Sequence, residues 1–160
     1  MNKRRAVIFD LDSTLCDTDH RREHLLEEVN GKWVKRKDPN WKGWEEGLVH
    51  DTPNWPVISI YEGAFASPRI DVVLCVTGRK EYERKATLNW FTEHGIPIPD
   101  MLFMRESTDK RPDTTVKEEI YRSKIEPHYD VLYVVEDRKR VVEMWRSLGL
   151  VCLQCVEGDY

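Results

Sequence analysis

The sequence lacks a long apolar run, an excess of basic residues and any low-complexity or repeated segment, and each absence excludes a class of protein. No stretch of its 160 residues approaches the roughly 20 apolar residues of a membrane-spanning helix. Its 25 lysines and arginines are outnumbered by 29 aspartates and glutamates, which disfavours attachment to nucleic acid through overall charge but permits a local basic surface. With 40% hydrophobic and 34% charged residues, the composition is typical of a folded globular domain without a membrane partner.

Cysteines are few, and their spacing does not complete a metal site. Cys152 and Cys155 form a C-x-x-C pair, but no second pair exists for zinc. A redox C-x-x-C usually opens a helix, whereas this pair lies in an apolar segment, 150–156, that is typical of a strand. We interpret these cysteines, with Cys16 and Cys75, as packing residues; a redox or metal role is the less favoured alternative.

Two further signals are missing. The apolar run 6–9 is too short for the core of a signal peptide, so we expect a cytoplasmic protein, in the host cytoplasm if it is viral. No G-x-x-x-x-G-K-[ST] loop occurs, so no nucleotide-binding P-loop is expected. The length fits one domain, which we place at residues 1–160.

Short apolar runs alternate with helical patterns along the chain. The expected strands lie at 6–9, 72–76, 101–104, 131–135 and 150–153, and the expected helices at 82–94, 114–124 and 138–148. Continuous apolar strands are typical of a parallel sheet covered on both faces. The pattern predicts an α/β fold of the Rossmann-like type, with a parallel five-stranded sheet flanked by helices.

The connection after the first strand is far longer than one crossover needs. We expect a small cap or insertion at about 22–60, not a second domain. It is rich in tryptophan: Trp33, Trp41, Trp44 and Trp55. We favour these tryptophans as the insertion's own small core, with base stacking over the active site as the alternative. A nearby basic run is either solvated, as favoured, or a guide for a polynucleotide backbone; it contains Lys32, Lys35, Arg36 and Lys37.

Polar residues gather directly after the first, second and fourth expected strands. They are Asp10 and Asp12 after the first, Thr77, Gly78 and Arg79 after the second, and Glu136, Asp137 and Arg138 after the fourth. The carboxyl ends of parallel strands meet at one edge of the sheet, where such folds bind ligands. Crowded carboxylates need a cation, and Mg²⁺ with its oxygen ligands is the natural one.

This set of residues can carry phosphoryl transfer. A carboxylate beside Mg²⁺ can attack phosphorus and form an aspartyl-phosphate, and an acid two residues later can protonate the leaving oxygen and then activate water. Thr77 and backbone N–H groups can hold phosphoryl oxygens, and Lys117 can neutralise charge in the transition state. Taken alone, Asp10 and Asp12 could equally cap a turn, and Lys117 could lie on a solvated helix face.

Four motifs in chain order resemble those of the haloacid dehalogenase (HAD) superfamily of phosphotransferases. They are Asp10-x-Asp12-x-Thr14, Thr77, Lys117 and the pair Glu136-Asp137. The resemblance implies a HAD-type fold in which Asp10 is the nucleophile and Asp12 the general acid and base. It also implies that Asp10, the backbone carbonyl of Asp12 and an acid of the fourth motif hold Mg²⁺. The candidate metal ligands are therefore Asp10, Asp12, Glu136 and Asp137.

Within that superfamily the sequence resembles the 3′-phosphatase domain of phage polynucleotide kinase/phosphatases, most densely over 104–160. The candidate phosphate-binding residues are then Thr14, Arg21, Thr77, Gly78, Arg79, Arg105, Asp113 and Arg138. The resemblance implies that Arg21 and Arg79 contact the substrate phosphate and that Asp113 orients Lys117. For Arg105 an ion pair with Glu106 or Asp109, and for Arg138 one with Glu136 or a nearby acid, are open alternatives.

Three features depart from the pattern of those relatives. Ser13 replaces the usual glycine of the first motif, which is tolerable where the backbone does not need a positive φ. Glu136 replaces an aspartate, so the metal role falls more naturally to Asp137. The P-loop of a kinase half is missing, and we therefore expect a stand-alone phosphatase.

The sequence predicts a Mg²⁺-dependent phosphomonoesterase that works through an aspartyl-phosphate and removes 3′-phosphates from polynucleotide ends, as in nucleic-acid repair. Two alternatives stay open. The first keeps the chemistry and takes free nucleoside monophosphates or other small phosphoesters as substrate. The second, less favoured because the first motif is intact, is a non-catalytic binding module.

Overall fold

Five parallel strands form the centre of the computed structural model, which describes residues 3–158. They are β1 (Arg4–Phe9), β6 (Val72–Lys80), β7 (Met101–Arg105), β8 (Tyr129–Arg138) and β9 (Cys152–Gly158). Their order is β7-β6-β1-β8-β9, and every neighbouring pair is parallel. The predicted α/β architecture is confirmed, with β6 and β8 continuing through the polar residues that follow their apolar cores.

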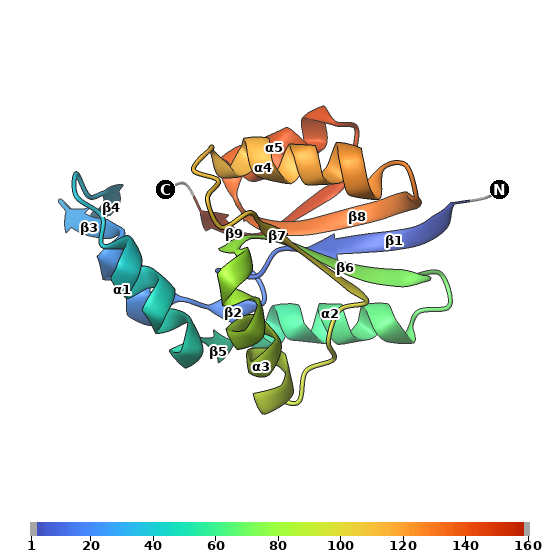
Figure 1. The fold of residues 1–160 in the computed structure, drawn as a ribbon, viewed down its shortest axis with the longest axis horizontal. Coiled ribbons are helices and arrows are strands. Elements are labelled where there is room, and N and C mark those ends of the chain that lie inside the picture. The colour runs from blue at the N-terminus through green and yellow to red at the C-terminus, as the bar shows by residue number, and fades with distance from the viewer. Residues whose placement is uncertain (1–2, 159–160) are drawn as a thin grey trace.

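Helices cover both faces of this sheet, as Figure 1 shows. On one face lie α2 (Trp55–Ala66) and α3 (Arg84–Glu93), which is preceded by the short turn η3 (Glu81–Glu83). On the other lie α4 (Asp113–Ile120), which continues into the π-helical turn η4 (Tyr121–Ile125), and α5 (Lys139–Ser147). Two separate apolar cores result, one between each helical layer and the sheet. Among residues 3–158, no helix combines the length and apolar character needed to cross a bilayer.

The C-x-x-C pair lies on β9, where its two sulfurs belong to different cores. Cys152 packs in the core beneath α4 and α5, whereas Cys155 packs against the core beneath α2 and α3. Both thiols are free. Positions three apart on a strand point to opposite faces, so this arrangement is one of packing residues.

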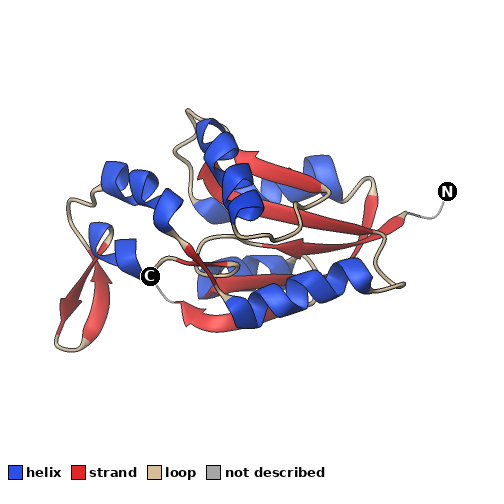
Figure 2. Ribbon diagram, turned by 90° about the horizontal axis from the view of Figure 1, so that it is seen from below, coloured by secondary structure: helices blue, strands red, loops and turns tan. Residues whose placement is uncertain are grey.

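A run of short elements separates β1 from α2. They are β2 (Cys16–Asp17), η1 (Asp19–His24), β3 (Leu26–Val29), β4 (Lys32–Lys35), α1 (Trp41–Glu46), η2 (Gly47–His50) and β5 (Thr52–Pro53). β2 pairs with β5 and closes the base of this segment; we call residues 18–51 the insertion. It projects beyond the carboxyl edge of the sheet in both Figure 1 and Figure 2. The expected boundary near residue 60 falls inside α2, the crossover helix, whose Val57 and Ile58 are buried in the domain core.

The tryptophans do not form a core for the insertion, and that interpretation was wrong. Trp33, Trp41 and Trp55 are 39%, 57% and 59% exposed. Trp44 is half-buried, with the Arg21 guanidinium 3.9 Å from the centroid of its ring. The insertion is instead anchored by a buried arginine, and most of its aromatic surface is left facing outward.

Candidate active site

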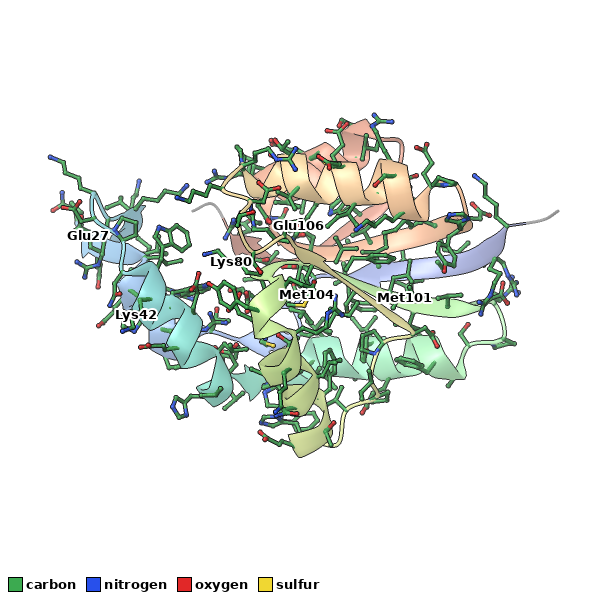
Figure 3. All side chains as sticks on the ribbon, viewed as in Figure 1. Glu27, Lys42, Lys80, Met101, Met104 and Glu106 are labelled. Carbon is green, nitrogen blue, oxygen red and sulfur yellow. The ribbon has the colours of Figure 1, made fainter. Side chains whose placement is uncertain are left out.

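Two breaks in the sheet ladder occur where the polar residues begin. The β6–β7 register shifts between Val76 and Lys80, and the β8–β9 register shifts between Glu136 and Arg138. Irregularities of this kind end regular pairing and re-aim side chains. Figure 3 shows the result at this edge, where Lys80 points toward the insertion and its Nζ lies 2.7 Å from Glu45 Oε1 of α1.

The turn after β1 sends successive side chains to different partners. Ser13, at its centre, has a φ of +62°, a left-handed conformation that glycine adopts without strain and other residues adopt at a cost. Serine was expected to be tolerable here only if the backbone did not need a positive φ, and this condition is not met. Its Oγ lies 2.7 Å from Thr18 Oγ1. Asp12 on one side of it contacts arginines, and Thr14 on the other donates a hydrogen bond to Asp137 Oδ1 at 3.4 Å.

Three buried carboxylates and one lysine form what we call the Asp10 centre: Asp10, Glu136, Asp137 and Lys117. The three acids each offer an oxygen within 4.8 Å of the others. Lys117 Nζ lies 2.9 Å from Asp10 Oδ1 and 2.8 Å from Glu136 Oε2. It is also 3.4 Å from Asp113 Oδ2, one helical turn earlier on α4. Although α4 is amphipathic, Lys117 is only 1% exposed and faces the acids.

The electrostatics of the Asp10 centre are dominated by burial and by an excess of negative charge. Burial, followed by the charge of Glu136, raises the pKa of Asp10 well above its usual range. Burial raises the pKa of Glu136 to about 7 against the opposing effect of Lys117, and burial with the Asp10 charge raises that of Asp137. Burial alone would lower the pKa of Lys117, but Asp10 and Asp113 outweigh it. An oxygen-lined cluster with one cation for three carboxylates fits a hard divalent metal ion.

A second group, the Asp12 centre, consists of two acids and two arginines: Asp12, Asp51, Arg21 and Arg79. Arg21 Nη2 lies 2.6 Å from Asp12 Oδ1 and 2.6 Å from Asp51 Oδ2. Arg79 Nη2 lies 2.6 Å from Asp12 Oδ1 and 2.8 Å from Asp51 Oδ2. Each guanidinium thus bridges the two acids, and positive and negative groups are equal in number.

The two acids of the Asp12 centre differ in their titration. Burial raises the pKa of Asp51, which is fully buried, to about 6 despite its hydrogen bond with Arg21. Burial also acts on Asp12, but Arg79 and Arg21 outweigh it and hold the pKa of that carboxyl well below its usual range. In this arrangement Asp12 is ionised.

Asp51 is the site residue that sequence reasoning missed. It follows η2 and precedes Thr52 and Pro53, a pattern that marks a turn but does not mark one acid as buried. Trp44 was also unforeseen as a partner, since its carbonyl oxygen accepts a hydrogen bond from Arg21 Nη1 at 3.0 Å. Only the folded insertion brings these groups to Arg21.

Of the residues expected after the second strand, Arg79 belongs to the Asp12 centre, and Gly78 lies against Asp113. Thr77 is fully buried, and its Oγ1 accepts the backbone N–H of Arg79 at 3.2 Å. Gly78 must lack a side chain, because a Cβ there would lie 2.5 Å from Asp113 Oδ1. The carboxyl end of β6 therefore packs directly against the first turn of α4, which carries Lys117 one turn later.

Two further predicted arginines meet at Asp113. Arg105 donates to the carbonyl of Gly78 at 3.0 Å and to Asp113 Oδ1 at 3.2 Å, while Asp109, its expected alternative partner, pairs with Arg111. Arg138 Nη1 lies 3.9 Å from Asp113 Oδ2. Asp113 is thus shared by Lys117 and both arginines, and although its burial opposes this, these cations lower its pKa.

The fold and the site together define a phosphatase of the HAD type: a five-stranded parallel sheet with an acid cluster, a buried lysine and paired arginines at its carboxyl edge. Residues 4–160 match the model of the polynucleotide kinase PNKP phosphatase domain, and the chain belongs to that family.

The chain spans only part of the length of the relatives and solved structures that it matches. It is 30% identical over 156 residues to a protein of Autographa californica nuclear polyhedrosis virus, assigned as a bifunctional polynucleotide kinase/RNA ligase; the match covers 98% of this chain and 20% of that protein. Pnkp1/Rnl/Hen1 complexes, one described as an RNA repair complex, contain a chain that is 29% identical with a TM-score of 0.79, covering 99% of this chain and 44% or 48% of that one. A class C acid phosphatase from Bacillus anthracis, 17% identical with a TM-score of 0.60 over 86% of this chain and 53% of its own, shares the fold.

Proposed function

We propose that the chain is a Mg²⁺-dependent phosphomonoesterase that removes 3′-phosphates from polynucleotide ends through an aspartyl-phosphate. One observation carries the proposal: Asp10 shares a buried cluster with two further acids and Lys117. The turn after β1 then places Asp12 in a separate cluster with two arginines. A nucleophile and a proton donor two residues apart, each with its own electrostatic environment, suit two-step phosphoryl transfer.

The acids of the Asp10 centre are suited to hold the metal. Asp10, Glu136 and Asp137 supply oxygen ligands only, and their pKa values are raised by burial first and by the charges of neighbouring carboxylates second. Glu136 is the least available of the three, since its oxygens already accept bonds from Lys117 Nζ and the Asp137 backbone N–H. Mg²⁺ bound there would neutralise charge on the phosphoryl oxygens.

The chemical steps use the side chains of this chain. An Asp10 oxygen attacks phosphorus as the bond to the 3′-oxygen breaks, and Asp12 gives that oxygen its proton. A water molecule then attacks the phosphorus of the aspartyl-phosphate and gives a proton to Asp12, which restores both acids. Lys117 keeps the Asp10 carboxylate oriented and offsets charge in the transition state, which is metaphosphate-like in most analyses.

Proton donation by Asp12 requires that its arginines change partners. With both guanidinium groups on its oxygen, Asp12 holds no proton to give. Arg21 and Arg79 each keep Asp51 as a second partner, so they can turn toward a substrate phosphate without becoming unpaired. Asp12 then loses two positive neighbours, so its pKa rises and the carboxyl group can hold a proton to donate.

Family membership supports a nucleic-acid end as the substrate, and a comparison of substrates tests it. We would measure phosphate release with Mg²⁺ from an oligonucleotide carrying a 3′-phosphate, and from free 3′- and 5′-nucleotides at equal concentration. We expect the oligonucleotide to give the highest kcat/KM, and none of the substrates to react after chelation of the metal. A preference for free 5′-nucleotides would overturn the assignment to polynucleotide ends while leaving the phosphatase chemistry in place.

A further inference from the structure

The hairpin formed by β3 and β4 carries exposed basic and aromatic side chains that the site has not used. All four residues of β4 are exposed, and they read Lys-Trp-Val-Lys. Among the described residues, neither Lys32 nor Lys35 forms an ion pair with a carboxylate. Arg36, by contrast, fixes the base of the hairpin, because its Nε donates to the carbonyls of Glu23 and Leu26. The hairpin is therefore anchored, while its lysines are available.

The register of the hairpin shows which side chains face the rest of the protein. Leu26 pairs with Lys35 and Glu28 with Trp33, and alternate positions of a strand share one face. Leu26 is buried, so the face that carries Trp33 and Lys35, together with Glu28, is the inner one. Glu27 belongs to the opposite face and lies at the outer end of the molecule in Figure 3.

This inner face lies beside the basic start of α5. In Figures 1 and 2 the hairpin stands beyond the carboxyl edge of the sheet, on the side where β9 ends. From this position the charges of Arg140 and Arg138 act on Lys35, whose pKa is lowered by burial and then by these two arginines. Arg140 is exposed in the first turn of α5 and pairs with no acid in the described part of the chain.

The same positive surface continues into the Asp10 centre. Arg138 directly follows Asp137, and its guanidinium lies 3.9 Å from Asp113, the ion-pair partner of Lys117. At the other edge, Arg22 of η1 lies 5.4 Å from the centroid of the Trp33 ring and is the neighbour of Arg21 in the Asp12 centre. Cations and an exposed indole thus run from both centres to the hairpin.

We propose that the inner face of the β3–β4 hairpin, with Trp33 and Lys35, and the first turn of α5, with Arg140, form a binding surface for single-stranded polynucleotide. The surface takes the nucleotides that precede the 3′-phosphate and rests on the proposed function for the position of that phosphate. A chain of phosphates matches a line of cations, and a base stacks on an exposed indole in any sequence. Lys35 and Arg140, which pair with no acid among residues 3–158, favour a polyanion over an uncharged partner.

Binding of an oligonucleotide that ends in a 3′-hydroxyl tests the surface without relying on catalysis. We would follow fluorescence anisotropy of a labelled 20-nucleotide strand with the K35E/R140E double variant, with W33A and W33F, and with R69E as control. Arg69 is exposed and precedes β6, at the opposite edge of the sheet. We expect at least tenfold weaker binding for K35E/R140E, about fivefold or more for W33A, recovery in W33F, and no change for R69E.

Salt and substrate length supply the second readout. Removing two phosphate contacts lowers the slope of log K against log salt by about 1.4 in a single strand. In K35E/R140E the ratio of kcat/KM for a 3′-phosphorylated oligonucleotide to that for a nucleoside 3′-monophosphate should fall about tenfold. If K35E/R140E binds the oligonucleotide as R69E does, the surface is wrong. If the wild type binds through these residues but releases no 3′-phosphate, the proposed function fails and the surface stands.

Discussion

The two charged centres at the carboxyl edge of the sheet are neighbours in sequence and opposites in charge balance. The Asp10 centre sets three clustered acids against Lys117, whereas the Asp12 centre sets two acids against two arginines. The Asp10 centre is buried and the Asp12 centre is buried except for Asp12 itself, whose side chain is 22% exposed. The turn at Ser13 joins them. The Asp10 centre has fewer positive than negative groups, whereas the Asp12 centre has equal numbers of both.

This difference indicates a division of labour. A buried cluster with surplus carboxylates is costly until a cation joins it, so the Asp10 centre is suited to bind metal and present a nucleophile. A balanced cluster is stable without any ligand and keeps Asp12 ionised. In the proposed mechanism its arginines exchange partners when an anion enters, and this would allow the centre to recognise phosphate and to time the release of a proton.

Removal of the proposed nucleophile should have the largest effect. In Asp10→Asn the amide cannot attack phosphorus, and we expect phosphate release to fall by at least about 10⁴-fold. Circular dichroism should show an intact fold, since the volume of the side chain is conserved. Retained activity would mean either that Asp12 and not Asp10 is the nucleophile, or that no covalent intermediate forms.

The next test removes one acid from the balanced centre. Asp51→Asn leaves two buried arginines with a single carboxylate, and breaking a buried pair costs about 3–5 kcal/mol. Urea unfolding measures this loss. Asp71→Asn is the control, because the Asp71–Arg5 pair is largely exposed and such pairs contribute about 0–1 kcal/mol. Equal losses of unfolding free energy in the two variants would show that burial does not strengthen the ion pairs of Asp51.

Metal binding should distinguish the centres with a smaller effect. We expect Mg²⁺ at 100 times its Kd to raise the free energy of unfolding by about 2.7 kcal/mol. Asp137→Asn should abolish most of this gain, whereas Asp51→Asn should keep it, and chelation should reverse it. A gain that disappears with Asp51→Asn and survives Asp137→Asn would show that the ion binds at the Asp12 centre and not at the Asp10 centre.

The smallest effect concerns the turn that separates the centres. Ser13→Gly and Ser13→Ala both remove the hydroxyl that contacts Thr18, but only glycine relieves the positive φ. We expect the glycine variant to be more stable than the alanine variant by about 1 kcal/mol. Equal unfolding midpoints would show that the backbone at Ser13 is not strained.

Much of the Asp10 centre could be predicted from the sequence because its residues stand in fixed positions after strands. Asp10, Glu136 and Asp137 each follow an apolar run, and parallel strands must bring their carboxyl ends together. Lys117 was less visible, since an amphipathic helix gives no sign that one lysine faces inward. Its identification depended on a motif resemblance, and the structure places it against all three of Asp10, Asp113 and Glu136.

The Asp12 centre could be predicted only in part. Arg21 and Arg79 were assigned from the resemblance, but their shared partner Asp51 lies 30 residues beyond Arg21 in a loop. Pairing across that distance depends on how the insertion folds back through β2 and β5. The exposure of Trp33 and Trp41 could not be predicted either, because the sequence of an aromatic-rich segment is the same whether its rings pack together or face solvent.

The sheet, the order of its motifs and the grouping of Asp10, Glu136 and Asp137 follow from the sequence, because each depends on short-range pattern and on the geometry common to parallel strands. The balance of charge around Asp12, the positive φ at Ser13 and the face that the hairpin turns toward α5 are known only from the complete fold. These depend on contacts between segments far apart in the chain, where the free energy of burying a charge selects partners that no local pattern reveals.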